Sequence, residues 1–238
     1  MKATFLRLCC AAALVFAGEG RARAFDFSNI QNWVGAGPNQ AAFVVAWWDG
    51  KTPDPMVWGY KWSGDAPTVL VMMQAIQAAD NRFSFTPNPV YSSPPSYAVY
   101  SVFYDLAGLG GTPVVGFPGN LGGTENGSPP YPADHYREGW NINGFWGELI
   151  GNGNPYNGGS WNSKAALGVG YDTVANNSWY ALSFSTDEAH FTIPSPPAPS
   201  VGVPAAPEPA TAVLLTLLTL GLGAQRLRGL PRLKQPRP

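Results

Sequence analysis

The residues with the most distinctive chemistry are the aromatic and amide side chains that alternate along positions 140–162. The flat C–H face of a sugar ring stacks on an exposed indole or phenol ring, while amides and carboxylates bond the sugar hydroxyl groups. The pattern predicts a glycan-contact surface built from Trp140, Trp146, Tyr156 and Trp161. The same rings would also suit the core of a β-sheet domain, because tryptophan is highly buried on average. The sequence leaves both interpretations open.

Three carboxylates near this stretch, Asp134, Glu138 and Glu148, are candidates for acid–base catalysis. Glycoside hydrolysis uses two carboxyl groups about 5 to 9 Å apart, a separation that sequence spacing does not fix. The histidines, His135 and His190, do not form a helical ligand pair for zinc and are expected to be structural. The chain contains no Gly-x-Ser-x-Gly elbow and no phosphate-binding loop. We therefore expect no enzymatic activity, and a secreted glycan-acting hydrolase is the alternative.

No cofactor is expected from the residue pattern. Asp49 with Asp54, or Asp187 with Glu188, would suit a calcium ion in a loop. The twelve-residue EF-hand pattern is absent, so a calcium site has no further support.

Hydrophobic periodicity predicts that residues 25–193 form a mainly β domain with one helix. Ala41–Trp48 is apolar on both alternating sets, as expected for a strand buried on both faces. Trp58, Tyr60 and Trp62 fall on one face of a second strand, which should be half-buried. Thr68–Ala79 carries apolar residues at steps of three and four and should form the helix.

Further strands are predicted where β-branched and aromatic residues are frequent. These segments are Arg82–Thr86, Tyr97–Asp105, Pro113–Phe117 and Ser178–Ser185. Gly119–Asp134 and Gly151–Lys164 are rich in Gly, Asn, Ser and Pro, and are expected to be loops. Short strands joined by such loops favour an antiparallel sandwich or jelly-roll-like domain.

The charge of the predicted domain differs from that of the whole chain. The chain has a formal net charge of −1, but residues 25–193 hold five Lys or Arg against thirteen Asp or Glu, a net charge of −8. A domain of this sign is a poor partner for nucleic acid, whose binding depends on basic residues that neutralise phosphates. Nucleic-acid binding is therefore not expected.

The first 24 residues have the pattern of a signal peptide. Lys2 and Arg7 precede the apolar run Leu8–Ala17, and Ala22 and Ala24 fit the small-x-small pattern read by signal peptidase. Cleavage after Ala24 would also remove the chain's two cysteines, which occupy positions 9 and 10. The mature protein would then have neither a disulfide nor a thiolate ligand.

The end of the chain has three consecutive parts. Residues 194–209 are a proline-rich linker that favours an extended spacer and ends in Pro207, Glu208 and Pro209. Residues 210–225 form a predicted transmembrane helix whose apolar run, Ala210–Ala224, is short for a bilayer that needs about 20 residues. Residues 226–238 are a basic tail with Arg226, Arg228 and Arg232, which should stay cytoplasmic by the positive-inside rule.

This arrangement resembles the PEP-CTERM sorting tail of exported bacterial proteins. The matching residues are the Pro207-Glu208-Pro209 motif, the apolar run after it and the arginine-rich end. The resemblance implies that exosortase recognises the tail, cleaves near the motif and releases the protein, often in bacteria that make exopolysaccharide. It covers only the end of the chain and implies nothing about the fold of the domain.

Together these patterns predict an exported protein of the cell surface or extracellular matrix, held transiently in the inner membrane. Signal peptidase and exosortase are the expected processing partners. Contact with extracellular polysaccharide is the expected role of the domain, and a structural coat protein without a ligand is a further alternative.

Overall fold

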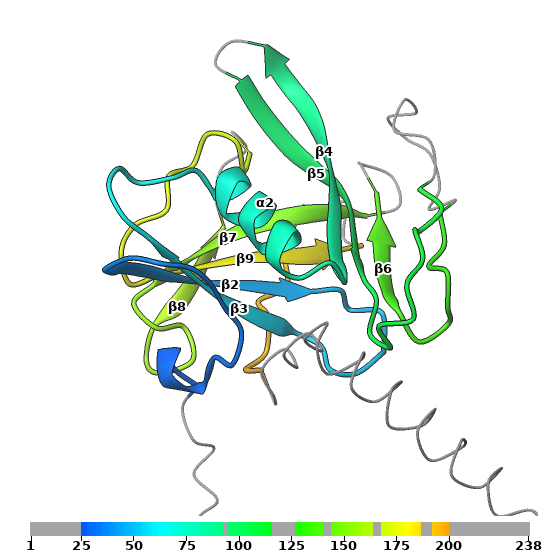
Figure 1. Ribbon diagram of the computed structural model, residues 1–238, viewed down its shortest axis with the longest axis horizontal. Coiled ribbons are helices and arrows are strands. Elements are labelled where there is room, and N and C mark those ends of the chain that lie inside the picture. Colours follow the sequence, from blue (N-terminus) through cyan, green and yellow to red (C-terminus); the bar gives the residue numbers. More distant parts are fainter. Residues whose placement is uncertain are drawn as a thin grey trace, which may run out of the picture.

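The computed structural model describes residues 25–92, 95–115, 127–139, 144–163, 168–186 and 192–199 (Figure 1). The predicted signal peptide, Pro-Glu-Pro motif, sorting helix and basic tail lie outside these residues, as does Trp140. Within the described residues, no helix is both long enough and apolar enough to cross a membrane.

The larger of two sheets among the described residues has six strands in the order β1-β3-β2-β9-β7-β8. β1 pairs with β3 and β2 pairs with β9 in parallel, and the remaining pairs are antiparallel. The strands are β1 (Trp33–Gly35), β2 (Asn39–Ala46), β3 (Met56–Trp62), β7 (Phe145–Asn152), β8 (Ser160–Ser163) and β9 (Ser178–Ser185).

The smaller sheet is antiparallel and has the order β4-β5-β6. Its strands are β4 (Phe83–Ser92), β5 (Pro95–Tyr104) and β6 (His135–Glu138). The β4–β5 hairpin extends past the helix α2 (Val69–Ala79), and β6 stands beside the end of β2 (Figure 1). A short 3-10 helix, η1 (Phe27–Asn29), lies near the start of the described chain.

A hydrophobic core covers each face of the larger sheet. Phe43, Trp47 and Trp58 point into the first core, which α2 and the smaller sheet cover. Val44 and Trp179 point into the second core, which the N-terminal stretch from Phe25 to Ile30 covers together with Ile193. β2 is therefore buried on both faces, as its sequence predicts, because residues from Ala41 to Ala46 have no exposed surface.

The predicted helix is confirmed. The hydroxyl of Thr68 caps α2 by accepting a hydrogen bond from the Val71 N–H at 3.3 Å. The buried residues Val69, Met72, Met73 and Ile76 follow the expected three- and four-residue steps.

The domain is mainly β with one α-helix among its described residues, as expected. The sequence pattern did not predict four of its strands. These strands are β1, β6, β7 and β8. β7 contains two glycines, which weaken a strand signal but are required by packing. A Cβ atom at Gly147 would overlap the side chain of Ile193, and one at Gly151 would lie 2.9 Å from the Cβ of Trp179.

Two further predictions need correction. β3 is buried on both faces along most of its length, not half-buried, because Val57 enters the second core and the Trp33 ring covers Gly59. In the described part of the segment Pro113–Phe117, Val114 forms an isolated bridge with Ser128 and no strand.

The contact between Gly59 and the Trp33 ring gives a test of the fold. We expect Gly59→Ala in the full chain to lower the free energy of unfolding by roughly 1–3 kcal/mol, because the added Cβ would overlap the indole ring. Urea unfolding measures this change. In a Trp33→Ala background the same substitution should cost less than about 0.5 kcal/mol, since the space is then open. An equal cost in both backgrounds would show that β1 does not cover β3 in this way.

Candidate functional site

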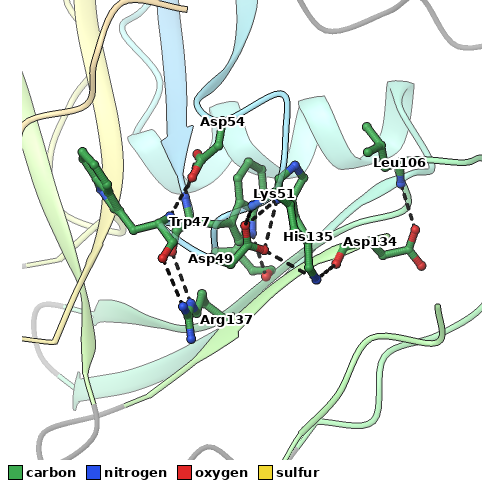
Figure 2. A network of polar contacts seen from close by, with 10 residues as sticks. Trp47, Asp49, Lys51, Asp54, Leu106, Asp134, His135 and Arg137 are labelled. Atoms are coloured by element: carbon green, nitrogen blue, oxygen red, sulfur yellow. Dashed lines mark hydrogen bonds and ion pairs between the residues drawn. The ribbon is translucent and has the colours of Figure 1, made fainter. Parts of the chain in front are cut away.

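Asp54 holds the chain where it leaves β2. The backbone N–H of Trp47 donates to one carboxyl oxygen of Asp54 at 3.0 Å, and the N–H of Trp48 donates to the other at 2.7 Å (Figure 2). Burial raises the pKa of Asp54 above its usual value, although the two N–H groups act in the opposite direction. After β2 ends at Ala46, the backbone N–H groups of Trp47 and Trp48 therefore bond a side chain instead of a neighbouring strand.

Trp47 and Trp48 point to opposite environments. Trp47 is fully buried and its indole N–H donates to the Val102 carbonyl at 3.1 Å, whereas Trp48 is 44% exposed. The backbone φ of Trp48 is +53°, a left-handed conformation that is unusual for a bulky residue. Such strain persists where surrounding contacts fix the geometry, and it is common at functional sites.

Arg137 of β6 binds the other side of the same dipeptide. Its guanidinium donates to the Trp47 carbonyl at 3.3 Å and to the Trp48 carbonyl at 3.1 Å (Figure 2). The guanidinium carbon also lies 5.3 Å from the centre of the Phe184 ring. Asp54 and Arg137 therefore fix both the donors and the acceptors of the two tryptophans.

The Trp48 ring is fixed through its nitrogen. Its Nε1–H donates to the Ser183 Oγ at 2.9 Å, and the Ser183 hydroxyl donates to the Pro194 carbonyl at 2.6 Å. Ser183 is fully buried in β9. The ring is thereby oriented from its polar edge, and its surface stays partly open to solvent.

A hollow of about 330 Å³ lies beside this ring. Its described lining consists of Trp48, Phe184, Ser185, Thr186, Thr192 and Pro194. The wall formed by residues 192–194 is attached to the larger sheet, because the Ser185 hydroxyl donates to the Thr192 carbonyl and Ile193 packs against Gly147. An apolar ring and several hydroxyl groups therefore meet at one concave surface, which we call the Trp48 hollow.

Asp49 and His135 form a buried polar pair that packs against Trp47, the residue before Trp48. The Nδ1 atom of His135 lies 3.1 Å from both carboxyl oxygens of Asp49, and its ring stacks on Trp47 with centroids 4.7 Å apart. Burial raises the pKa of Asp49, but the hydrogen bonds and charges of His135 and Lys51 together outweigh it, so the net pKa is below the usual value. Lys51 contacts the Asp134 carbonyl and lies 3.7 Å from Asp49. Because His135 has no exposed surface, this pair is out of reach of a substrate in solvent.

The predicted glycan-contact residues do not form one surface in the described structure. Trp146 is 8% exposed and packs in the first core, edge-to-face against Trp47 and Phe184. Tyr156 and Trp161 are half-buried and pack against the second core. The rings of Tyr156 and Trp161 therefore lie together on one face of the larger sheet, and Trp146 lies on the other face.

The three candidate catalytic carboxylates take separate structural positions. Asp134 is fully buried and accepts a hydrogen bond from the Leu106 N–H at 3.1 Å. Glu138 is fully buried and accepts from the Tyr136 hydroxyl and the Gly127 N–H, both at 2.5 Å. Glu148 is half-buried in β7. None of the three belongs to the described lining of the Trp48 hollow.

The proposed calcium ligands also have other contacts. Asp49 pairs with His135 and Asp54 binds the two tryptophan N–H groups, while Asp187, Glu188 and His190 lie outside the described residues. Among the residues that the structure does describe, no three His, Cys, Asp or Glu side chains are placed to hold a metal ion.

The sequence offered one clue to the Trp48 hollow. Two adjacent tryptophans followed by Asp49 and Gly50 mark the end of a strand at a turn, where alternation would place one of the two rings outside. The periodicity alone assigned both rings to a strand buried on each face. Trp48 bonds Arg137 and Ser183, which are 89 and 135 residues away in the sequence. No local sequence pattern connects residues at such distances.

Comparison of the chain with protein-family models, with curated proteins and with solved structures finds no match.

The Asp49–His135 pair predicts an acid-dependent stability. Because its folded-state pKa is lowered, ionised Asp49 stabilises the fold above the pKa of an unfolded aspartate, about 3.9, and this contribution is lost as pH falls through the folded-state value. We expect Asp49→Asn to cost roughly 1.5–3 kcal/mol at pH 7 and much less at pH 3. Urea unfolding of the full chain at both pH values, with the exposed Asp65→Asn as control, measures this difference. A pH-independent cost would contradict the ionic role of Asp49.

Proposed function

We propose that this is an exported, non-catalytic protein whose domain contacts extracellular polysaccharide through the Trp48 hollow. The observation that carries the proposal is the Trp48 ring, which is 44% exposed and oriented by bonds from its backbone and its ring nitrogen. The strained backbone of Trp48 is consistent with selection for display of the ring instead of stability.

The composition of the hollow supports a sugar ligand. Thr186 and Thr192 bring hydroxyl groups to the lining that Trp48 shares, whereas the Ser185 hydroxyl is buried and donates to the Thr192 carbonyl. Aromatic faces and hydroxyl groups match the apolar and polar sides of a pyranose ring. We propose binding without hydrolysis, with the Trp48 ring as the contact surface.

The ends of the described domain support the proposed export route. Phe25, the proposed first residue after signal peptidase cleavage, packs edge-to-face against Tyr156 and Trp179, and its carbonyl accepts a hydrogen bond from Asn154 at 2.9 Å. At the other end, Ser183 and Ser185 bind the segment that leads into the proline-rich linker. The domain would thus begin firmly packed at the cleavage point. The described start of the proposed linker, residues 194–209, is also partly packed, because Pro196 and Pro199 are buried.

The proposed sequence of events follows from these ends. Signal peptidase removes residues 1–24, the helix at residues 210–225 holds the protein in the inner membrane, and exosortase then acts near Pro207-Glu208-Pro209. The protein reaches the cell surface or the extracellular matrix. The fold that we propose in finer detail is a sandwich or jelly-roll-like domain followed by a sorting helix. Its sheets are antiparallel except where β1 pairs with β3 and β2 pairs with β9.

Substitution of Trp48 separates binding from folding. We expect Trp48→Gly to abolish retention on polysaccharide. The free energy of unfolding should change by less than about 2 kcal/mol, because relief of the left-handed φ offsets the loss of one hydrogen bond. Retention of the full chain on insoluble glucan, mannan and the producing strain's own polysaccharide measures binding, in a detergent without a sugar headgroup.

The matched control is Tyr171→Ala, which removes another exposed aromatic ring, 49% exposed, outside the hollow. This variant should bind as the wild type does. Undiminished binding by Trp48→Gly, or loss of binding by Trp161→Ala alone, would refute the proposed site. Absence of binding to every polymer by the folded wild type would refute the proposed function.

The sorting tail is tested independently of the domain. We expect Glu208→Ala, or deletion of residues 226–238, to leave an unprocessed protein in the inner membrane, because each change removes a feature of the sorting signal. Mass spectrometry of the mature C-terminus in wild type and variants decides the matter. Recovery of wild-type protein from the cell exterior with residues 210–224 still attached would contradict processing.

A further inference from the structure

We infer that the Trp48 hollow selects uncharged sugar rings, so that its ligand is a neutral polysaccharide and not an acidic one. This inference rests on the proposed function and adds the chemical class of the ligand. It follows from the charges in and around the hollow and from its size.

The described lining of the hollow offers hydroxyl groups without charged groups. All six lining residues, which are Trp48, Phe184, Ser185, Thr186, Thr192 and Pro194, are uncharged. A hydroxyl group both donates and accepts hydrogen bonds, so it matches the hydroxyl groups of a neutral sugar. A carboxylate or sulfate would instead need a charge-assisted donor, which this lining does not provide.

The nearest described cation serves the frame of the hollow. The guanidinium of Arg137 donates to the carbonyls of Trp47 and Trp48 (Figure 2). It also lies 5.3 Å from the centre of the Phe184 ring. Phe184 and Trp48 line the hollow, and Arg137 contacts the ring of the first and the carbonyl of the second. We therefore assign Arg137 a positioning role for the two tryptophans.

Lys51 lies 3.7 Å from Asp49 near Trp48, but carboxylates outnumber cations in the domain as a whole. A carboxyl oxygen of Asp54 lies 2.7 Å from the Trp48 backbone nitrogen, and Asp49 follows Trp48 in the chain. Residues 25–193 as a whole carry a formal net charge of −8. A polyanion that approaches this domain meets a field of its own sign, which lowers its local concentration, most strongly at low ionic strength.

The size of the hollow limits how much of the polymer it holds. Its volume of about 330 Å³ is near the lower limit of ligand pockets, roughly 300 Å³. Such a site accommodates one or two sugar rings, whose affinity is expected to be about millimolar. Useful retention therefore requires a long chain with many equivalent rings, because repeated binding sites along a polymer raise the overall avidity.

The test compares polymers that share a backbone and differ in charge. The pairs are dextran with dextran sulfate, laminarin with sulfated laminarin, and hydroxyethyl cellulose with carboxymethyl cellulose. Binding of the full chain is measured at about 50 and 500 mM NaCl, where the screening length changes from about 14 Å to about 4 Å. Trp48→Gly and Tyr171→Ala are measured in parallel.

We expect at least one neutral polymer to bind with less than a twofold change between the two salt concentrations. Its charged partner should bind at least tenfold more weakly at 50 mM NaCl. Trp48→Gly should abolish the neutral binding, and Tyr171→Ala should not change it.

Three results would overturn the inference. Tighter binding of a charged partner that depends on Trp48 and weakens with salt would show that the hollow accepts anions, while the proposed function would stand. Neutral binding that persists in Trp48→Gly would place the sugar site elsewhere. A folded protein that binds none of the six polymers, nor the strain's own polysaccharide, would overturn the proposed function and the inference with it.

Discussion

The two hydrogen bonds from the backbone of Trp47 and Trp48 to the Asp54 carboxyl group determine how β2 ends. With its backbone held at this point, β2 places the Trp47 ring in the core and leaves the Trp48 ring partly exposed. The buried ring then stacks on His135 and joins the two sheets, while the exposed ring forms one wall of the hollow. The core and the candidate site thus depend on the same carboxyl group.

The strain at Trp48 has a physical explanation in this arrangement. A left-handed backbone at a tryptophan is unfavourable by itself, so other contacts must stabilise it. Asp54, Arg137 and Ser183 supply these contacts from three separate segments of the chain. Since Ser183 also binds Pro194, the start of the proline-rich segment belongs to the same framework. Trp48 and Pro194 are therefore held by the same residue, Ser183.

Local patterns in the sequence predicted those parts of the fold that depend on local spacing. The apolar run of β2 and the three- and four-residue steps of α2 are examples, because each reports directly on burial. β7 was missed because Gly147 and Gly151 resemble loop residues, although each is a glycine to make room for a neighbouring side chain. The Trp48 hollow was missed because its frame joins Trp48 to Ser183 and Arg137, and no pattern in a single sequence reports contacts between such distant residues.

The central claim is that a sugar ring contacts the Trp48 indole. The chain has nine tryptophans, so ¹⁵N-labelled protein should give nine indole N–H signals, and Trp48→Phe assigns the one from Trp48. Titration with the bound neutral polysaccharide should shift the Trp48 signal progressively and leave those of the buried Trp47 and Trp58 in place. An unchanged Trp48 signal, with a shift at Trp161 instead, would contradict the account.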